Sequence, residues 1–582
     1  MPKIEVHESL FTKLAGKTWA DTDELERDLT CAKAELDEKA DPSLPASERT
    51  LKIELNDTNR PDLWSTAGVA RQLRVWTGGK ASSYDFFSTA KEAKKAKYRV
   101  VVEESVRKVR PFLAGFVATG KEITDESLKD AIQTQEKLAW NFGRKRRSVS
   151  MGLYRISRIQ WPIHYKGVDP ESVSFVPLQW DRPMNLREIL REHPKGKEYA
   201  FIQEHEDIHP LLVDDKDEVL SYPPIINSAD LGAVKVSDRD LFVEVTGTDL
   251  ASVNLAVNIM ACDLADQGYT VEPVLVEYAY DTPWGKSITT PYAFQEECFC
   301  SLERVERFLG EKLSADDCVK ALRRMDCTAE ACTAPERGSK DAVPGVRAGL
   351  PPYRNDYLHA ADVVEDIMIG RGLDSFKPLQ PSDFTIGRLT PLTLSGRRVK
   401  EVLIGLGYQE MIYNYLGSGK DYIERMCIEG KDALRISNPM TENYEYVRPS
   451  ILPSLLSSEA VSANAVFPHR IFEVGKVAYR CDEENYGSRT RQHLGFLQAS
   501  GDANYNIIAS QVNALMYYLS REYKLAELDD GRFIPGRAAA VIWKGKKIGV
   551  FGEIHPQVLE NWGLATPCIA CEIDIEELLL NQ

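Results

Sequence analysis

Four acidic residues in one short stretch have the spacing of a candidate cation site. The segment PPYRNDYLHAADVVEDIMIGRGL predicts a helix that begins near Ala361. On that helix Asp362, Glu365 and Asp366 stand at positions i, i+3 and i+4 and share one face, and Asp356 can fold back onto it. Crowded carboxylates repel one another unless a cation joins them, and hard oxygen ligands suit Mg²⁺. A solvated acidic face with a capping aspartate is the equally good alternative.

A second pattern, HExxH, is matched by His205, Glu206 and His209. On a helix this spacing lets two imidazoles bind Zn²⁺ while the glutamate acts as the general base of a metallopeptidase. Pro210 follows His209 directly, however, and the residue before a proline disfavours helical geometry. We therefore expect the match to be accidental and to lie in a loop.

Hydroxyl and carboxylate groups at the ends of two expected strands form a third candidate site. SYPPIINS contains Ser221, and FVEVTGTD contains Glu244 and Thr246. Such groups can position a water against an ester. Polar residues at the edge of a sheet are the simpler interpretation on spacing alone, and neither a nucleophile elbow nor a Ser/His/Asp triad is present.

The elements that must position these groups are predicted from periodicity and turn chemistry. Residues 50–55 alternate like a strand, and the polar turn NDTNRPD, with Asp57, Asn59, Arg60 and Asp62, leads into a helix. That helix should run from near residue 63 to 76, with Asp62 or Ser65 as its cap and Gly78-Gly79 as its end.

Three further segments follow along the chain. Residues 97–285 read as mixed α/β, with a strong helix in DLASVNLAVNIMACDLADQG that has an aspartate cap and a glycine stop. Residues 288–378 read as small and mostly helical, with two short helices around the start signal SADD. The remainder, from about residue 380, should open with a helix and then a strand, and close with two strands around a Lys-Gly-Lys turn before a final helix.

Length and composition indicate a soluble protein of several domains. The chain has 582 residues, of which 43% are hydrophobic and 27% charged. We expect no membrane span and no secretory signal, and the eleven scattered cysteines suit free thiols in a reducing, cytoplasmic setting. A formal net charge of −16 does not by itself suggest a nucleic-acid binder, but the cluster Arg144–Arg147 is a local candidate for phosphate contacts. A solvated loop beside a helix is the equally good alternative for this cluster.

Together these segments resemble one family, the β subunit of phenylalanyl-tRNA synthetase in its archaeal and eukaryotic form. The resemblance is carried, in the family's order, by ELNDTNRPDLWSTAGVARQLR, SYPPIINS, FVEVTGTD, PPYRNDYLHAADVVEDIMIGRG, ISNPMTENYEYVRPSILPSLL, FEVGKV and GEIHP. It covers nearly the whole chain. The bacterial form has additional oligonucleotide-binding and anticodon-binding modules, which we do not expect here.

The resemblance implies an α+β multidomain fold and a place in a larger enzyme. Its expected domains are an N-terminal β-subunit domain (1–90), a mixed α/β editing domain (91–287), a small helical winged-helix-like domain with the carboxylates (288–378) and an inactive, antiparallel class II synthetase-like domain (379–582). With the α subunit, in an (αβ)₂ heterotetramer, it would attach phenylalanine to tRNA(Phe). The α subunit would bind ATP and phenylalanine, and the class II-like domain would pack against it.

The resemblance also implies two sets of site residues. Asp356, Asp362, Glu365 and Asp366 match the family's Mg²⁺ site near the α-subunit contact. Leu212, Ser221, Glu244 and Thr246 match the editing pocket, which hydrolyses tyrosine wrongly attached to tRNA(Phe). An editing site makes physical sense, because a pocket for phenylalanine rejects tyrosine imperfectly and a second sieve is then needed. The archaeal pocket often has aspartate at the position of Glu244.

Two other functions are compatible with parts of the sequence. A synthetase relative retained as a non-catalytic RNA-binding or assembly protein would keep the fold without hydrolysing mischarged tRNA. A zinc peptidase would need stoichiometric Zn²⁺ that is lost on His205→Ala. An intact editing pocket separates the first of these alternatives from the enzyme subunit.

Overall fold

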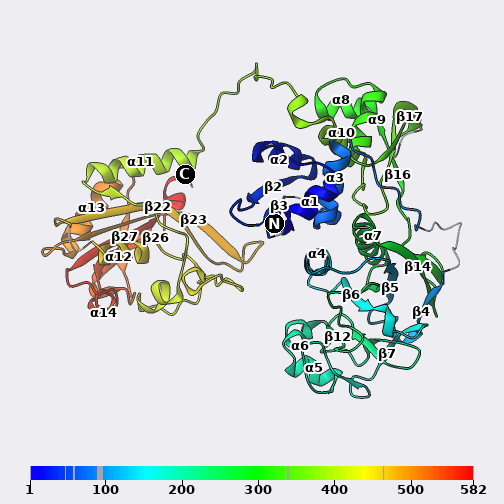
Figure 1. The fold of residues 1–582 in the computed structure, drawn as a ribbon. Helices are drawn as coiled ribbons and strands as arrows, with labels where there is room; N and C mark the ends of the chain where they lie inside the picture. Colours follow the sequence, from blue (N-terminus) through cyan, green and yellow to red (C-terminus); the bar gives the residue numbers. More distant parts are fainter. Residues whose placement is uncertain are drawn as a thin grey trace. The chain divides into compact units, whose positions relative to one another are not determined.

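A computed structural model describes residues 2–45, 48–56, 59–87, 96–336, 338, 340–462 and 465–580. It divides into two compact units, Met1–Leu379 and Gln380–Gln582. Each unit is a mixture of helices and sheets, in agreement with the expected α+β multidomain class (Figure 1). None of the described helices has the length and apolar character needed to cross a bilayer.

The chain opens on a three-stranded antiparallel sheet with helices beside it. Strand β3 (Thr50–Leu55) confirms the predicted strand and lies between β1 (Lys3–His7) and β2 (Ala34–Glu38). The first two helices are α1 (Glu8–Ala15) and α2 (Thr22–Leu29).

Helix α3 (Thr66–Trp76) follows a short 3₁₀ turn and confirms the helix expected after the polar turn. Of the two proposed caps, Ser65 is the one used: its hydroxyl accepts a hydrogen bond from the Gly68 amide. Asp62 instead pairs with Arg60, 2.8 Å away. Asp57 lies outside the described residues.

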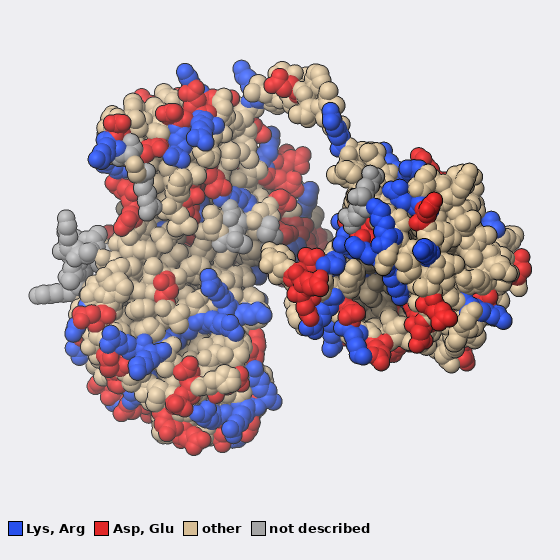
Figure 2. All heavy atoms as spheres, turned by 180° about the vertical axis from the view of Figure 1, so that it is seen from behind, with Lys and Arg blue, Asp and Glu red and all other residues tan. Residues whose placement is uncertain are grey.

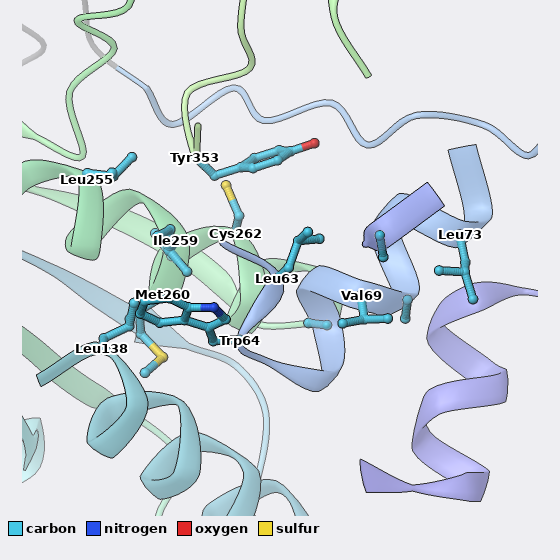
Figure 3. Close-up of a cluster of buried hydrophobic side chains, with 14 of the residues drawn as sticks. Leu63, Trp64, Val69, Leu73, Leu138, Leu255, Ile259, Met260, Cys262 and Tyr353 are labelled. Carbon is cyan, nitrogen blue, oxygen red and sulfur yellow. The ribbon is translucent and has the colours of Figure 1, made fainter. Parts of the chain in front are cut away.

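Helix α3 packs on α7 (Leu250–Asp266), the long helix whose aspartate cap was expected and is provided by Asp249. Figure 3 shows Leu63 and Trp64, which precede α3, beside Ile259, Met260 and Cys262 of α7. Buried Arg71 adds ion pairs across the same contact, 2.7 Å from both Asp263 and Asp266. The N-terminal segment and the following α/β segment therefore share one core.

A ten-stranded mixed sheet forms the middle of the first unit. Its strand order is β12-β11-β10-β7-β4-β14-β5-β13-β6, with β15 paired to β14. The strands are β4 (Tyr98–Val102), β5 (Phe112–Thr119), β6 (Val149–Arg155), β7 (Ile163–Val168), β10 (His209–Val213), β11 (Val219–Tyr222), β12 (Ile226–Asn227), β13 (Leu241–Gly247), β14 (Thr270–Tyr278) and β15 (Ser287–Thr290). Only the pairs β4–β14 and β4–β7 are parallel. Helix α7 packs on β5 and β13.

Shorter elements flank this sheet. They are α4 (Asp125–Lys137) with the π-helical turn Leu138–Phe142, α5 (Leu186–Glu192), α6 (Pro194–Tyr199) and the two-stranded ladder of β8 (Ser174–Phe175) with β9 (Met184–Asn185). The π-helical turn leads directly into the basic cluster Arg144–Arg147.

In the segment after residue 288 the two short helices predicted around SADD are confirmed, but the prediction that the segment is mostly helical is wrong, because it also contains a sheet. Helices α8 (Leu302–Leu309), α9 (Ala315–Arg324) and α10 (Ala360–Arg371) are joined by a three-stranded sheet of β16 (Glu297–Ser301), β18 (Ala342–Gly349) and β17 (Thr328–Pro335). Strand β17 is largely exposed and rich in alanine and threonine, so it lacks the alternation that marks a strand. These residues form a strand because they pair with β18.

The second unit is built on a seven-stranded sheet, antiparallel except for its first pair. Its order is β19-β22-β23-β27-β26-β25-β24, and the strands are β19 (Gln409–Glu410), β22 (His469–Arg480), β23 (Ser488–Ala499), β24 (Lys524–Glu527), β25 (Phe533–Trp543), β26 (Lys546–Ile554) and β27 (Cys568–Asp574). Its helices are α11 (Pro391–Gly405), α12 (Leu452–Ala460), α13 (Tyr505–Tyr518), α14 (Pro556–Asn561) and α15 (Ile575–Leu580). A small ladder pairs β20 (Leu416–Gly417) with β21 (Tyr446–Val447). The predicted opening helix and the closing strand–turn–strand–helix are confirmed.

Candidate active site

A cavity of about 440 Å³ lies between strands from the two ends of the large sheet. Ser221 from β11 lines it together with Glu244 from β13. These strands are near opposite ends of the strand order, so the sheet must curve to bring them together. Much of the remaining wall is apolar, from residues that include Leu128, Ile132, Met151, Leu153, Pro223, Pro224 and Ile225. The cavity has the apolar lining and few polar groups of a small-molecule site.

Tyr154 of β6 connects the two predicted residues. Its hydroxyl lies 2.8 Å from the Ser221 hydroxyl and 2.9 Å from Oε1 of Glu244. The other carboxylate oxygen, Oε2 of Glu244, is buried and has no hydrogen-bond partner within the described structure. A buried polar atom without a partner costs free energy, so its presence in a cavity points to a ligand that satisfies it.

Burial also changes the acidity of this carboxylate. Loss of water around Glu244 raises the pKa to about 7, although the hydrogen bond from Tyr154 and the charge of Arg110 act in the opposite direction. The group is therefore poised to change charge near neutral pH, as perturbed carboxyls in functional sites commonly do.

Gly152 makes room for this arrangement. It lies opposite Glu244 in the ladder between β6 and β13. A Cβ atom at this position would stand 2.2 Å from the Tyr154 hydroxyl oxygen and 2.7 Å from Oε1 of Glu244. Only glycine leaves space for both side chains.

The structure places the other two predicted pocket residues outside the cavity wall. Thr246 is buried behind it, and its hydroxyl contacts Arg110 Nε at 2.9 Å and Ser150 Oγ at 3.1 Å. Leu212 of β10 is fully buried in the apolar core beneath the sheet. Of the four residues, the structure brings Ser221 and Glu244 together in the cavity, and Ser150 takes the place on the wall that was expected for Thr246.

Tyr154, Ser150, Gly152 and Arg110 were not anticipated from the sequence. The available signal was the alternation of Ser150, Gly152 and Tyr154 in SVSMGLYR, since residues two apart on a strand share a face. Arg110 gave no such signal, because its partners lie in β6 and β13 and are distant in sequence.

The HExxH match is accidental, as expected. His205 is exposed in a turn, whereas His209 is fully buried at the start of β10. Both ring nitrogens of His209 are engaged: Nδ1 lies 2.6 Å from the Tyr222 hydroxyl and Nε2 lies 3.2 Å from the Glu206 carbonyl oxygen. Tyr222 lines the cavity, so His209 supports the cavity wall instead of binding zinc.

The four carboxylates predicted to bind Mg²⁺ have separate partners in the structure. Asp362 caps its own helix by accepting hydrogen bonds from the amides of Leu358 and His359, both at 2.7 Å. Glu365 pairs with Lys33 at 2.9 Å. Asp356 and Asp366 do meet, but at the Arg354 guanidinium.

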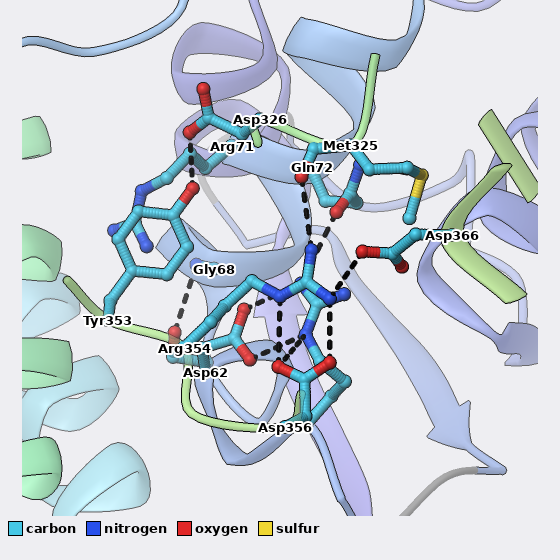
Figure 4. Close-up of polar contacts among 12 residues, drawn as sticks. Asp62, Gly68, Arg71, Gln72, Met325, Asp326, Tyr353, Arg354, Asp356 and Asp366 are labelled. Carbon is cyan, nitrogen blue, oxygen red and sulfur yellow. Dashed lines mark hydrogen bonds and ion pairs between the residues drawn. The ribbon is translucent and has the colours of Figure 1, made fainter. Parts of the chain in front are cut away.

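Arg354 is the centre of a buried network (Figure 4). It lies 2.6 Å from Asp356 and 2.8 Å from Asp366. Burial works against ionisation of Asp356, but Arg354 lowers its pKa to about 2. Arg60 joins from the N-terminal segment, at 2.8 Å from Asp62 and 4.0 Å from Asp356. Guanidinium groups therefore neutralise the charge that a metal would otherwise balance, and within the described ranges no three acidic, histidine or cysteine side chains form a metal-binding group.

Two protein-family models match this chain. The model described as the tRNA synthetase B5 domain matches residues 298–373, which contain the three-stranded sheet and α10. The model described as the phenylalanyl tRNA synthetase beta chain CLM domain matches residues 379–575, which form most of the second unit.

Curated relatives match over their full length. The phenylalanine–tRNA ligase beta subunits of Treponema pallidum and Borrelia hermsii are 46% and 44% identical to this chain, and each alignment covers all of both chains. A crystal structure of an N-terminal fragment of the phenylalanyl-tRNA synthetase beta subunit from Pyrococcus horikoshii is similar as well. It is 33% identical, with a TM-score of 0.56 over 64% of this chain and all of the fragment.

Both of these full-length relatives come from spirochaetes, which are bacteria, whereas the resemblance had pointed to the archaeal and eukaryotic form. Identity above 40% over complete chains is nevertheless decisive for the family. The chain belongs to the family of phenylalanine–tRNA ligase β subunits.

Proposed function

We propose that this β chain carries the proofreading site of phenylalanine–tRNA ligase and that the cavity takes the tyrosyl group of mischarged tRNA(Phe). The observation that carries the proposal is the unpartnered Oε2 of Glu244 in a cavity with an apolar wall. A tyrosyl ring suits the wall, and its hydroxyl can donate the hydrogen bond that Oε2 lacks. A phenylalanyl ring would leave the buried oxygen unpaired, which is the physical basis for strong discrimination.

The reaction at this site is ester hydrolysis. The oxygen of a water adds to the ester carbonyl carbon, the bond from that carbon to the ribose oxygen breaks, and the ribose oxygen receives a proton. The hydroxyls of Ser150 and Ser221 line the cavity and can orient the water. Tyr154 holds Ser221 and Glu244 in fixed positions.

The test is hydrolysis of purified Tyr-tRNA(Phe) and Phe-tRNA(Phe) by the complete ligase. Glu244→Ala should lower the rate with Tyr-tRNA(Phe) at least about tenfold, the cost of one lost hydrogen bond to a charged group. The pair Ser221→Ala and Thr246→Ala should abolish hydrolysis, whereas attachment of phenylalanine should persist in every variant. Unchanged hydrolysis in Glu244→Ala would exclude this cavity.

For the assembly, we propose the (αβ)₂ heterotetramer, in which the α subunit binds ATP and phenylalanine and both subunits meet tRNA(Phe). The description of the relatives as β subunits supports a second chain of a different kind. We place the enzyme in the cytoplasm, where tRNA is charged, and eleven cysteines without disulfides suit a reducing compartment.

For the domains, we propose the boundaries 1–90, 91–287, 288–378 and 379–582, with an editing domain second and an inactive class II-like domain last. Two observations support the last two of these domains. The boundary between the two compact units falls between residues 379 and 380, and the family models match residues 298–373 and 379–575. We further propose that this organisation is the archaeal type, which the similarity to the Pyrococcus fragment supports.

For the metal, the ligase reaction uses Mg²⁺ with ATP, and we retain a Mg²⁺ site at Asp356, Asp362, Glu365 and Asp366 as a proposal. The side chains as they stand do not fit such a site, because Arg354 and Lys33 hold three of the four carboxylates. Mg²⁺ titration of the heterotetramer, compared with Asp362→Asn and Glu365→Gln, tests it: loss of one bound ion supports the site, and unchanged stoichiometry excludes it.

A further inference from the structure

The basic cluster Arg144–Arg147 lies beside the cavity and has no part in the site described so far. It forms a tight loop between the π-helical turn Leu138–Phe142 and β6. Arg144, Lys145 and Arg146 all have positive φ, at 51°, 57° and 65°. Three consecutive left-handed residues with side chains are costly, so the surrounding structure must hold the loop in place.

Backbone hydrogen bonds to Trp140 and Ala139 and the side chain of Arg110 hold the loop. This buried guanidinium donates hydrogen bonds to the carbonyl oxygens of Arg146 and Arg147 at 3.2 and 3.0 Å. It also contacts Ser150, which lines the cavity, and Thr246, which lies behind the cavity wall. One side chain thus fixes both the loop and the cavity wall.

The outer face of the loop forms a basic and aromatic hollow. Its lining residues are Trp140, Asn141, Arg144, Lys145, Arg147, Ser148, Phe201 and Thr248, and none of them is acidic. The described residues place no carboxylate within 4.0 Å of the charged groups of Arg144, Lys145 or Arg147, whereas Arg146 pairs with Glu136. The formal net charge of the chain is −16, and on the face drawn in Figure 2 small groups of Lys and Arg are interspersed with acidic residues.

Two aromatic side chains accompany these cations. Trp140 is 42% exposed with Lys145 5.3 Å from its ring, and Phe201 is 37% exposed with Arg147 4.8 Å from its ring. Alternating cations and exposed rings suit a single-stranded nucleic acid, whose phosphates pair with the cations while bases stack on rings or guanidinium planes.

The hollow adjoins the cavity. Ser148, which immediately precedes β6, lines the hollow, and Ser150 in β6 lines the cavity; two residues of extended chain span roughly 7 Å. Arg146 reaches from the loop to the cavity wall, where it contacts the carbonyl oxygen of Ile225 at 3.1 Å. The hollow is therefore close enough to the cavity to meet nucleotides attached to a tyrosyl ester bound there.

We propose that the hollow binds the single-stranded 3′ end of the tRNA, with phosphates on Arg144, Lys145 and Arg147 and bases on Trp140 and Phe201. This inference rests on the proposed proofreading function and adds the surface that delivers the substrate to it. Binding of a phosphate-rich strand is expected to depend on salt, with a slope of roughly −2 for three contacts.

The experiment compares two substrates in the complete heterotetramer. One is Tyr-tRNA(Phe), and the other is 3′-O-tyrosyl-adenosine, which carries the ester but no phosphate. The variant Arg144→Gln/Lys145→Gln/Arg147→Gln removes three charges and keeps side-chain length. The matched control, Lys97→Gln/Arg239→Gln/Lys286→Gln, removes three exposed charges from the same domain away from the hollow.

The expected result is a KM for Tyr-tRNA(Phe) about tenfold higher or more in the loop variant, with kcat unchanged, a shallower salt slope and unaltered hydrolysis of tyrosyl-adenosine. Trp140→Ala should also raise KM, and Trp140→Phe should restore it, because any ring provides a stacking face. These variants leave the loop charges intact, so they test the surface separately.

Other outcomes would overturn the inference. A loop variant that handles Tyr-tRNA(Phe) like the wild type would leave proofreading intact and assign the hollow to another partner, such as an acidic protein segment. An equal rise of the KM in the control variant would show that the effect comes from the overall charge of the domain and not from the hollow. A wild-type enzyme inert towards both substrates would overturn the proofreading function and this inference with it.

Discussion

Glu244 shows how one buried residue can combine recognition with a cost in stability. Its carboxylate lies in a cavity, hydrogen-bonded on one oxygen only, with a pKa of about 7 against an ordinary value of 4.5. A glutamate placed there for stability alone would be paired on both oxygens. The open oxygen is thus available to a ligand hydroxyl.

The stability of the cavity region should depend on pH through Glu244. Between about pH 4.5 and 7 the unfolded chain is ionised at this residue while the folded chain is not, so the free energy of unfolding falls as pH rises. Above pH 7 the free energy of unfolding is lower by about 3 kcal/mol, which corresponds to a pKa shift of this size. Hydrogen exchange of the β13 amides should accelerate from pH 5 to pH 8, after correction for intrinsic rates, in the wild type but not in Glu244→Gln. Equal behaviour of the two proteins would contradict the raised pKa.

Gly152 should be the least replaceable residue of the wall. In Gly152→Ala the new Cβ would overlap Tyr154 and crowd Glu244, so both must move. We expect hydrolysis of Tyr-tRNA(Phe) to fall more than about tenfold, the loss that follows misplacement of groups at a site, while charging with phenylalanine continues. Gly501→Ala, where a Cβ would meet nothing within 4 Å, is the control. Normal proofreading in Gly152→Ala would show that the space beside Tyr154 and Glu244 does not require glycine.

At the scale of elements, arginines join parts of the chain that are distant in sequence. Arg354 lies just before α10, and Arg60 lies before α3, yet both meet Asp356. Arg71 does the same between α3 and α7. The resemblance implies a Mg²⁺ ion among four carboxylates, and in this structure the guanidinium group of Arg354 pairs with two of them, Asp356 and Asp366.

Loss of Arg354 should therefore loosen the contact of α10 with the loop that precedes it, and through Asp356 the link of that loop to Arg60. Arg354→Met leaves Asp356 and Asp366 buried without their main partner, at a cost of about 3–5 kcal/mol. Arg354→Lys should recover little of this lost stability, because an ammonium group cannot form the bidentate contact that the Arg354 guanidinium makes with Asp356. Hydrogen exchange of α10 amides gives the measurement, with Arg371→Lys, at the end of the same helix, as the control. Protection equal to the wild type in Arg354→Met would contradict the network's role.

At the scale of the whole molecule, the chain is one component of a ligase. The relatives aligned over full length are β subunits, so charging activity is expected only with a second chain. The purified β chain should attach no phenylalanine to tRNA(Phe), and addition of the α subunit should restore the activity. Co-purification from native cells followed by a charging assay checks this. Charging by the β chain alone would show that the second unit is an active synthetase domain.

The sequence alone determined the local elements and the family. Strand 50–55, the helix ending at Trp76, the Asp249-capped helix and the strands around Lys544-Gly545 follow from periodicity, caps and turn residues, which act over a few positions. The family could be recognised from the sequence motifs without knowledge of the fold. Strand β17 shows the limit, because its residues become a strand only through pairing with β18.

The tertiary structure decided which residues meet. Ser221 and Glu244 were candidates from sequence, but their connection through Tyr154 exists only because a curved sheet brings β6 against β11. Burial separated Leu212 and Thr246 from the cavity, and Arg354 pairs with two of the four carboxylates expected to bind Mg²⁺. Contacts between residues far apart in the chain depend on sheet curvature and helix packing, and short-range patterns contain no information about either.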